Sequence, residues 1–483
     1  MEKNLFYDGQ TTVTISLWVG IGIILSLFFG WLIAVAGMPV ATLLIILPFI
    51  ISYLIIAFIQ PRISLLTFLV YCFLNSTLGK HIEGVQFGLG QDGLLLLAWL
   101  GIIFHKSGRY RLRHLNNSLV WMAVAWLAIT LLQIVNPEKP SFEGWFYEMR
   151  SASLYWVLTI PLVFMVFNKK ADINLFLNII ILLSVAGALY GAKQLFFGVD
   201  AAENRWLEAG AKKTHMLFGK LRIFSFYSEA GQFGASQATI AAVAIILALG
   251  PYTRTRKCWY AIAGLLLFYG MLISGTRGAL FGLAGGLFIY LLLSKKGSIL
   301  IAGALCGIIF FSILKYTHIG SGNQQISRLR TSLDPNDASF VVRLNNQAIL
   351  RDYLSNKPFG AGVGTIGTWG LKYNQDKFIS TIPPDSMFVK IWAMYGIIGF
   401  IIWFGIMLYI LGKSIGIIWQ TSDAVLRNQL TALCAGSTGV LLCSYGNEVL
   451  NTMPSSAIVY VSWALIWMSP RWDHKPVLKI SIP

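Results

Sequence analysis

The sequence predicts an all-α fold, a polytopic membrane helix bundle of about 14 transmembrane helices (range 12–14). Hydrophobic residues make up 56% of the 483 residues and charged residues only 12%, whereas soluble domains carry about 25% charged residues. The mean hydropathy is +0.68, and apolar runs long enough to cross about 30 Å of hydrocarbon recur along the chain. We therefore expect a single membrane domain over residues 1–483, with two long extracytoplasmic loops that contain short helices.

Fourteen apolar segments are predicted to span the membrane. The first is too long for the apolar part of a signal peptide and lacks a small-residue cleavage pattern, so we interpret it as a retained span. In chain order the spans lie at about 15–36, 40–59, 63–78, 93–104, 118–135, 151–167, 173–190, 234–250, 258–273, 278–294, 297–314, 386–411, 429–446 and 455–469.

Short basic connections predict how the bundle is oriented. They contain Lys106, Arg109, Arg111 and Arg113, then Lys169 and Lys170, then Arg254, Arg256 and Lys257, then Lys295 and Lys296. By the positive-inside rule these connections are cytoplasmic, and both termini lie on the same side. The two long connections, 191–233 and 315–385, then face the extracytoplasmic side. Long loops on a rigid scaffold usually carry function, so we expect the active site there.

Several classes of function are disfavoured by the sequence. The formal net charge of +17 is explained by the orienting loops, and no nucleic-acid-binding motif is present. No repeat of about 20 to 50 residues and no inverted repeat is visible, and acidic residues are scarce inside the spans, which disfavours a secondary transporter. The five cysteines show no CxxC spacing and no nearby histidine, so we expect no disulfide, no metal site and no cofactor.

The best candidate for chemistry is the polar segment from Arg343 to Lys390, which ends in an apolar helix. Arg343, Gln347 and Arg351 recur every four residues and would share one helix face. Asp385 places a carboxylate at the membrane boundary. Between them lie glycines at positions 360, 362, 364, 367 and 370. They match GxGxxG without a preceding strand, which excludes a dinucleotide site and leaves a phosphate cradle or a plain turn.

Further cations are predicted on the extracytoplasmic side. Arg277, in the run SGTRGAL, lies between two spans and needs an anion or carbonyl partner unless it snorkels to the interface. Arg222 and Glu229 precede another span, and Lys390 follows Asp385 by about one turn. We expect one carboxylate to be surrounded by Arg222, Arg277, Arg343, Arg351 and Lys390. Guanidinium groups bind pyrophosphate through two hydrogen bonds, so these cations would neutralise a pyrophosphate without a metal ion.

The order of these motifs resembles the O-antigen ligase and O-antigen polymerase superfamily of polytopic membrane glycosyltransferases. The resemblance rests on SGTRGAL around Arg277, an outward loop with Arg343, the run KPFGAGVGTIG, and the helix start FVKIWAMYGIIGF. It covers about residues 265–411 well and the earlier spans only in general character.

The resemblance implies a reaction and roles for several residues. In that superfamily a sugar chain on undecaprenyl pyrophosphate is transferred to an acceptor hydroxyl outside the bacterial inner membrane, and arginines bind the pyrophosphate. Arg277 and Arg343 occupy the matching positions, which implies catalytic roles for both. Ligases of the family typically carry His-Asn where this chain has Asp385-Ser386. This difference favours a polymerase of O-antigen or exopolysaccharide repeat units, with Asp385 as the proton acceptor.

Alternatives remain open at this point. Arg222, Glu229, Arg351 and Lys390 are expected to bind substrate, and Glu229 is a second candidate base. Asp385 is equally well explained as the N-cap of the following helix. The second enzymatic interpretation is a ligase that passes the glycan to a lipid A core or protein acceptor, and the non-enzymatic one is a flippase for lipid-linked oligosaccharides. Expected partners are the lipid-linked donor, the acceptor, and polysaccharide export or chain-length proteins.

Overall fold

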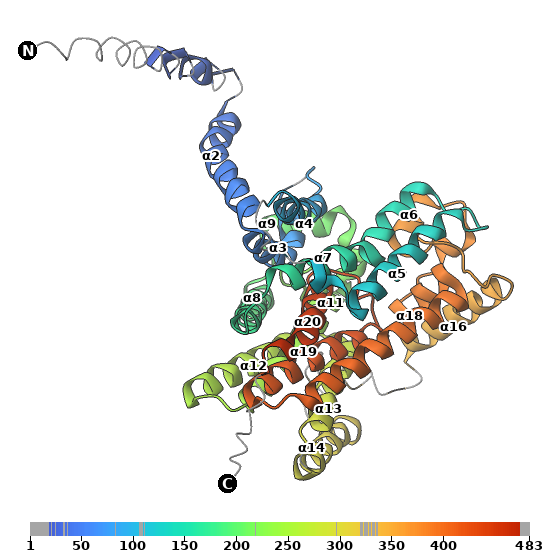
Figure 1. Ribbon diagram of the computed structural model, residues 1–483. Helices are drawn as coiled ribbons and strands as arrows, with labels where there is room; N and C mark the ends of the chain where they lie inside the picture. The colour runs from blue at the N-terminus through green and yellow to red at the C-terminus, as the bar shows by residue number, and fades with distance from the viewer. Residues whose placement is uncertain are drawn as a thin grey trace, which may run out of the picture.

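Helices form nearly all of the regular structure, as the composition predicts (Figure 1). The computed structural model describes residues 37–473 except 83, 106–109, 111, 218, 296, 319–321, 323–326, 328, 329, 331–333, 335 and 336, and also residues 19, 20, 22–24, 26–31, 34 and 35. Nine residues of the predicted first span, 15–36, lie outside the described residues.

The first part of the chain consists of helices that pack side by side. They are α2 (Met38–Ile59), α3 (Pro61–His81), α4 (Gly88–Ile103), α5 (Ser118–Leu132), α6 (Phe142–Met149), α7 (Tyr155–Val166) and α8 (Ala171–Phe197). A π-turn over Arg150–Leu154 joins α6 to α7 without a break, so the helix predicted to begin near residue 151 already begins at Phe142. Ser141 caps this longer helix, because its hydroxyl accepts a hydrogen bond from Gly144 N at 3.1 Å.

The rest of the chain contains two long connecting segments between helices. The first holds α9 (Ala201–Trp206), α10 (Lys212–His215) and a two-stranded antiparallel ribbon of β1 (Met216–Leu217) and β2 (Lys220–Leu221). The second holds α16 (Ala338–Leu354) and α17 (Gly367–Tyr373). The remaining helices are α11 (Ala230–Ala248), α12 (Arg254–Ser274), α13 (Arg277–Leu293), α14 (Gly297–Tyr316), α18 (Met387–Gln420), α19 (Ala424–Cys443) and α20 (Ser455–Met468).

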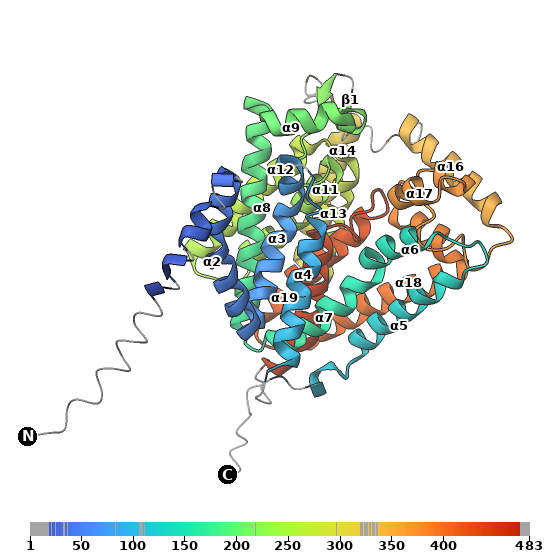
Figure 2. The ribbon, with the colours of Figure 1, turned by 90° about the horizontal axis from the view of Figure 1, so that it is seen from above.

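Seven helical segments among the described residues are long and apolar enough to cross a membrane. They are Pro61–His81, Ser118–Val135, Phe142–Val166, Ala171–Phe197, Ala230–Ala248, Arg254–Ser274 and Met387–Gln420. Shorter apolar helices, α13 among them, lie beside these segments. The chain is therefore a polytopic helical membrane protein, while the number of about 14 spans stays a prediction. Helices α9, α16 and α17 and strand β1 lie toward one end of the bundle (Figure 2).

Helix α11 lies at the centre of the bundle, where it packs against α12, α13 and α19. Its sequence is rich in Ala, Gly and Ser, and small residues allow helix backbones to approach closely. Small residues also allow α13 and α19 to pack closely. A Cβ added to Gly282 would lie 2.1 Å from Cys443 Sγ and 2.9 Å from the Gly439 carbonyl oxygen, so only glycine fits there. This close packing sets the position of the N-terminus of α13.

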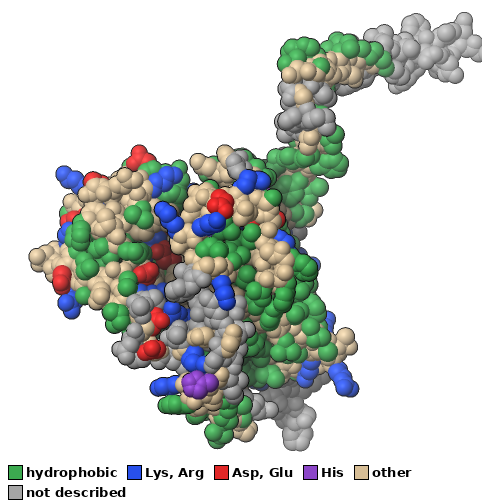
Figure 3. Space-filling model, turned by 180° about the vertical axis from the view of Figure 1, so that it is seen from behind, with side chains coloured by type: hydrophobic (Ala, Val, Ile, Leu, Met, Phe, Trp, Pro, Cys, Tyr) green, Lys and Arg blue, Asp and Glu red, His purple; other side chains and the backbone are tan. Residues whose placement is uncertain are grey.

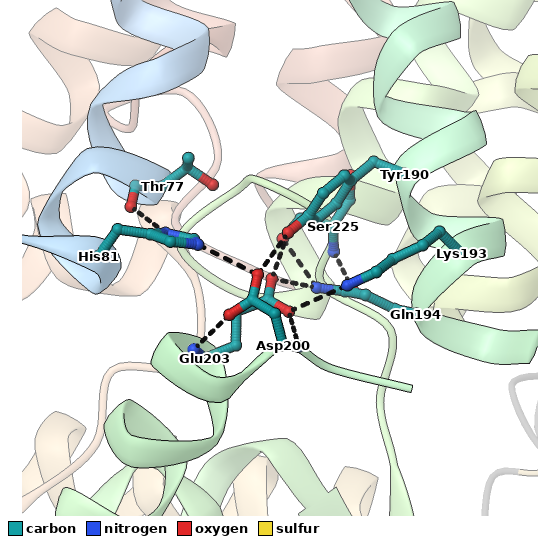
Figure 4. A network of polar contacts seen from close by, with 8 residues as sticks. All are labelled: Thr77, His81, Tyr190, Lys193, Gln194, Asp200, Glu203 and Ser225. Carbon is teal, nitrogen blue, oxygen red and sulfur yellow. Dashed lines mark hydrogen bonds and ion pairs between the residues drawn. The ribbon is translucent and has the colours of Figure 1, made fainter. Parts of the chain in front are cut away.

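A polar network joins α3, α8 and α9 and anchors the first connecting segment (Figure 4). The Asp200 side chain accepts a hydrogen bond from Glu203 N at 2.8 Å, and the Glu203 carboxylate accepts one from Asp200 N at 3.0 Å. The Tyr190 hydroxyl lies 3.1 Å from an oxygen of each carboxylate and donates its one proton between them, and His81 Nε2 lies 3.1 Å from Asp200 Oδ2. Burial alone would raise the pKa of Asp200, but these hydrogen bonds lower it, so the carboxylate stays charged.

Lys80 of α3 fixes the end of the same segment. Its ammonium group donates a hydrogen bond of 2.5 Å to the Tyr227 carbonyl oxygen and lies 4.0 Å from the Phe224 ring centroid and 4.8 Å from that of Trp206. The side chain is buried. Because Phe224 and Tyr227 lie between Arg222 and the start of α11, this contact holds the stretch that leads into the cavity described below.

The glycine-rich loop packs against α18 and α6. Gly396 kinks α18 with φ +68°, and a Cβ there would lie 2.0 Å from the Pro358 carbonyl oxygen. Ala361 N donates to the Ala393 carbonyl oxygen at 2.8 Å, and a Cβ on Gly364 would lie 2.2 Å from the backbone of Gly144. These glycines are required for close backbone contact, so the structure supports neither a phosphate cradle nor a plain flexible turn at this loop.

Candidate active site

A cavity of about 1730 Å³ lies between α12, α13, α14, α16 and the segment after α19. Five of the seven candidate residues line it, together with Gln347: Arg222, Glu229, Arg277, Arg343 and Asp385. They come from four separate parts of the chain. In the rear view, acidic and basic side chains lie side by side at a hollow in the surface (Figure 3).

The cavity has a polar end and an apolar end. Apolar residues of α12, α13 and α14 line the second part, among them Leu265, Phe268, Phe281, Phe288, Phe310 and Phe311. Gly303 and Gly307 of α14 lie among these side chains, and a Cβ on Gly307 would meet no atom within 4 Å. The shape suits a molecule with a charged head and a long apolar tail.

The N-terminus of α13 opens into the polar end. Gly275, with φ +58°, ends α12, and Thr276 is the residue before α13. The Thr276 hydroxyl donates to the Ala230 carbonyl oxygen at 2.8 Å, which fixes this turn against α11. Arg277 and Gly278 are then the first two residues of α13 and both line the cavity. A helix N-terminus attracts anions through its free N–H groups and its dipole, so Arg277 adds a guanidinium to a site that already favours negative charge.

Arg343 of α16 lies near the N-terminus of α13. A Cβ added to Gly446 would lie 3.7 Å from Arg343 Nη1 and 3.8 Å from the Cα of Gly278. The Arg343 guanidinium and the start of α13 therefore lie on the same side of Gly446, within contact distance of that position. Two arginines that are 66 positions apart in the sequence thus line the same cavity.

Asn447 is a functional candidate that the sequence reasoning missed. It lines the cavity, and a Cβ on Gly278 would lie 3.5 Å from Asn447 Nδ2. No described residue forms a hydrogen bond with its side chain, so the amide is available to a ligand. The polar run SYGNE between two apolar stretches is the sequence signal that could have identified it.

Glu229 and Arg222 also line the cavity and interact electrostatically with each other. Burial raises the pKa of Glu229, and nearby Glu448 adds to this rise while Arg222 opposes it. Burial lowers the pKa of Arg222, and its Nε atom is buried without a hydrogen-bond partner among the described residues. A carboxylate with a raised pKa is a better proton acceptor, so the environment of Glu229 suits a general base.

Asp385 lies at the start of α18, where Ser386 is the N-cap. The alternative that Asp385 is itself the N-cap is therefore wrong. Its backbone has φ +53°, a left-handed conformation that side chains other than Gly, Asn and Asp seldom adopt. The Asn346 amide of α16 lies 3.5 Å from Asp385 Oδ2. Strained backbone of this kind is concentrated at functional sites.

Arg351 and Lys390 lie outside the cavity. The Arg351 side chain is 74% exposed, and its Nε lies 3.3 Å from the neighbouring Asp352. Lys390 is buried and pairs with Glu148 at 3.0 Å and Glu448 at 2.7 Å. The structure thus brings three of the five predicted cations together in the cavity and separates the other two from them.

Residues 262–404 match the profile of the O-Antigen ligase family. The matched stretch runs from α12 into α18 and contains Arg277, Arg343 and Asp385, whereas Arg222, Glu229 and Asn447 lie outside it. No curated protein matches the chain. A family of this kind implies a glycosyltransferase-like membrane enzyme that acts on lipid-linked glycans. The match at residues 262–404 supports the superfamily of O-antigen ligases and O-antigen polymerases for this part of the chain.

Proposed function

We propose that this protein polymerises repeat units of a surface polysaccharide that are carried on undecaprenyl pyrophosphate. One observation supports this most directly: Arg277, Arg343 and the N-terminus of α13 converge at the polar end of a cavity whose other end is apolar. A polyprenyl pyrophosphate has this combination of a charged head and a long apolar tail. The tail would lie between α12, α13 and α14, and the pyrophosphate at the arginines.

The reaction that we propose is a displacement at the anomeric carbon of the donor sugar. A hydroxyl oxygen of the acceptor glycan forms a bond to that carbon, and the bond from the carbon to the phosphate oxygen breaks. The electron pair leaves with the polyprenyl pyrophosphate, whose charge Arg277 and Arg343 neutralise. We propose that these cations serve in place of a metal ion, so chelators should not slow turnover.

The hydroxyl proton passes to a carboxylate. Glu229 and Asp385 both line the polar end, and Glu229 has the pKa raised by burial that suits a base. We therefore propose Glu229 as the first choice and Asp385 as the second. Arg222 and Asn447 would bind the donor or the acceptor beside them.

Products from purified protein test the proposal. Protein in lipid nanodiscs is mixed with lipid-linked repeat unit, and the glycans are separated by size. We expect a ladder of longer chains that is lost in Arg277→Ala. Transfer to a lipid A core or protein acceptor without chain growth would identify a ligase. Movement of lipid-linked sugar between leaflets with no change in chain length would identify a flippase.

We also propose how the chain lies in the bacterial inner membrane. The long segments 191–233 and 315–385 would face the periplasm in a bundle of about 14 spans with both termini in the cytoplasm. Single cysteines in a cysteine-free background test this arrangement. Asn356→Cys, near Lys357, should react with an impermeant thiol reagent from outside, and a cysteine at Arg113 should not. The reverse pattern would contradict the periplasmic site.

A further inference from the structure

Arg277 is paired with a carboxylate in the ligand-free protein. Its Nη1 lies 2.6 Å from Oδ1 of Asp337, which immediately precedes α16 and lines the same cavity. Their side chains are 27% and 15% exposed. Asp337 also accepts a hydrogen bond from Phe340 N at 3.3 Å, as an N-cap residue does. The carboxylate thus lies against a guanidinium that the family resemblance assigns to a phosphate.

Carboxylates offset the cations throughout the polar end. Among the described lining residues, four cationic side chains face four carboxylates: Lys213, Arg222, Arg277 and Arg343, against Glu229, Asp334, Asp337 and Asp385. Net positive charge therefore does not explain how this end would bind an anion. Binding depends on which individual pairs an incoming anion replaces, because a like charge close to the ligand is unfavourable in a partly buried site.

An anion that binds Arg277 must displace Asp337 or share the guanidinium with it. Displacement loses a close ion pair, and sharing places two negative groups side by side. A diphosphate has a second phosphoryl group, which can contact Arg343 and the N-terminus of α13 while the first occupies Arg277. A monophosphate has one phosphoryl group, which cannot contact Arg277, Arg343 and the N-terminus of α13 equally well. It therefore forms fewer new contacts to compensate for the lost ion pair between Arg277 and Asp337.

We propose that Asp337 makes the site selective for polyprenyl diphosphates over polyprenyl monophosphates. This inference rests on the proposed function, since it concerns the head group of the same donor. A site can be selective because a repulsive group, here the Asp337 carboxylate, weakens the binding of one ligand more than that of another. The preferred ligand then needs no contact that the other ligand lacks. Asp337 would therefore weaken the binding of both lipids, and that of the monophosphate more strongly.

Lipid binding to the full-length protein tests this role. Purified wild-type protein and Asp337→Asn in nanodiscs are titrated with a polyprenyl monophosphate and with the diphosphate of the same chain length. We expect the variant to bind the monophosphate about tenfold more tightly and the diphosphate at most about threefold more tightly, so that the selectivity ratio falls. Asn is a good N-cap, so α16 should keep its start. Asp337→Ser, which also caps, repeats the test with a smaller side chain.

The matched control is Asp334→Asn, which removes the same charge from the same segment and the same cavity but not from the Arg277 pair. It should leave the ratio nearly unchanged. An unchanged ratio in both Asp337 variants, or weaker binding of both lipids, would overturn the inference and assign Asp337 a purely structural role. Wild-type protein that binds neither lipid would instead contradict the proposed function.

Discussion

Lys390 Nζ lies 2.7 Å from Glu448 Oε2 and joins the start of α18 to the segment after α19. Glu148 of α6 completes the cluster at 3.0 Å. The Met387 N–H also donates to the Ser444 carbonyl oxygen at 2.9 Å, so two contacts hold the same elements together. This arrangement holds the segment that carries Asn447 beside the start of α18, and we expect it to give Lys390 a structural role.

Loss of the Lys390 charge should destabilise the fold. In Lys390→Met, buried Glu148, which is 1% exposed, loses its cation, and breaking such a pair typically costs about 3–5 kcal/mol. We expect a clear drop in the thermal unfolding temperature in detergent. The double variant Lys390→Met with Glu148→Gln should recover part of it, because the buried charge is removed. Equal stability of Lys390→Met and wild type would contradict the structural role.

Arg343→Lys should lose most of the polymerising activity although it keeps the charge. An ammonium group cannot reproduce the planar two-point contact of a guanidinium with a phosphate. Arg351→Lys is the matched control, since Arg351 lies on the same helix, outside the cavity and 74% exposed. Steady-state rates on the lipid-linked repeat unit measure both. Similar rates for the two variants would exclude a specific contact at Arg343.

Paired carboxylate variants should identify the base. Glu229→Gln and Asp385→Asn keep shape and hydrogen bonding but accept no proton, and loss of a general base typically lowers the rate by about 10² to 10⁴. Asn also tolerates the left-handed backbone at position 385. We expect the larger loss in Glu229→Gln with donor binding intact. A larger loss in Asp385→Asn would transfer the role to Asp385.

The activity and the stability of the wild-type protein should both depend on pH through the titration of Glu229. Burial raises the pKa of Glu229, and only its deprotonated form can act as the base. As the pH is lowered, activity should therefore begin to fall at a higher pH than about 4.3, the ordinary pKa of a glutamate. The folded state then binds more protons than the unfolded state above that pH, so this group makes the protein less stable as the pH rises through its folded pKa. Glu229→Gln should remove this loss of stability in thermal unfolding scans that start below about pH 4.3 and extend to neutral pH. Identical scans for both proteins would contradict a raised pKa.

A large side chain in the apolar end should block the donor tail. Gly307 of α14 lines this end with no atom within 4 Å of its Cβ position, so Gly307→Phe fits the fold but fills the space. We expect a higher KM for the lipid-linked donor with little change in the thermal unfolding temperature. Gly412→Phe is the control, because Gly412 of α18 is equally open and lies outside the cavity. An effect of equal size in both variants would argue against a tail-binding groove.

The class of the protein follows from sequence alone because the hydropathy of a span is a local property. About 20 apolar residues suffice to predict a membrane helix, and the long helices of the described residues agree with this prediction. Helix ends were less predictable. The π-turn that joins α6 to α7 moves a helix start from about residue 151 to Phe142, because the ends depend on capping and local backbone geometry.

Motif order along the chain was also sufficient to select Arg277, Arg343 and Asp385 as candidates and to suggest the superfamily that the match at 262–404 supports. Their chemistry is recognisable from residue type and neighbours, without knowledge of the packing. The roles of these residues remain proposals that the variants above test.

Only the tertiary structure decided which charges share a cavity. The sequence placed Arg351 and Lys390 in the same cluster of cations as Arg343, but the first is exposed on α16, and two glutamates from distant segments pair with the second. Asp337 could not be recognised as a site residue from the sequence for the same reason. Electrostatic contacts act over a few ångströms in space, and the helices that bring these side chains together are far apart in the chain.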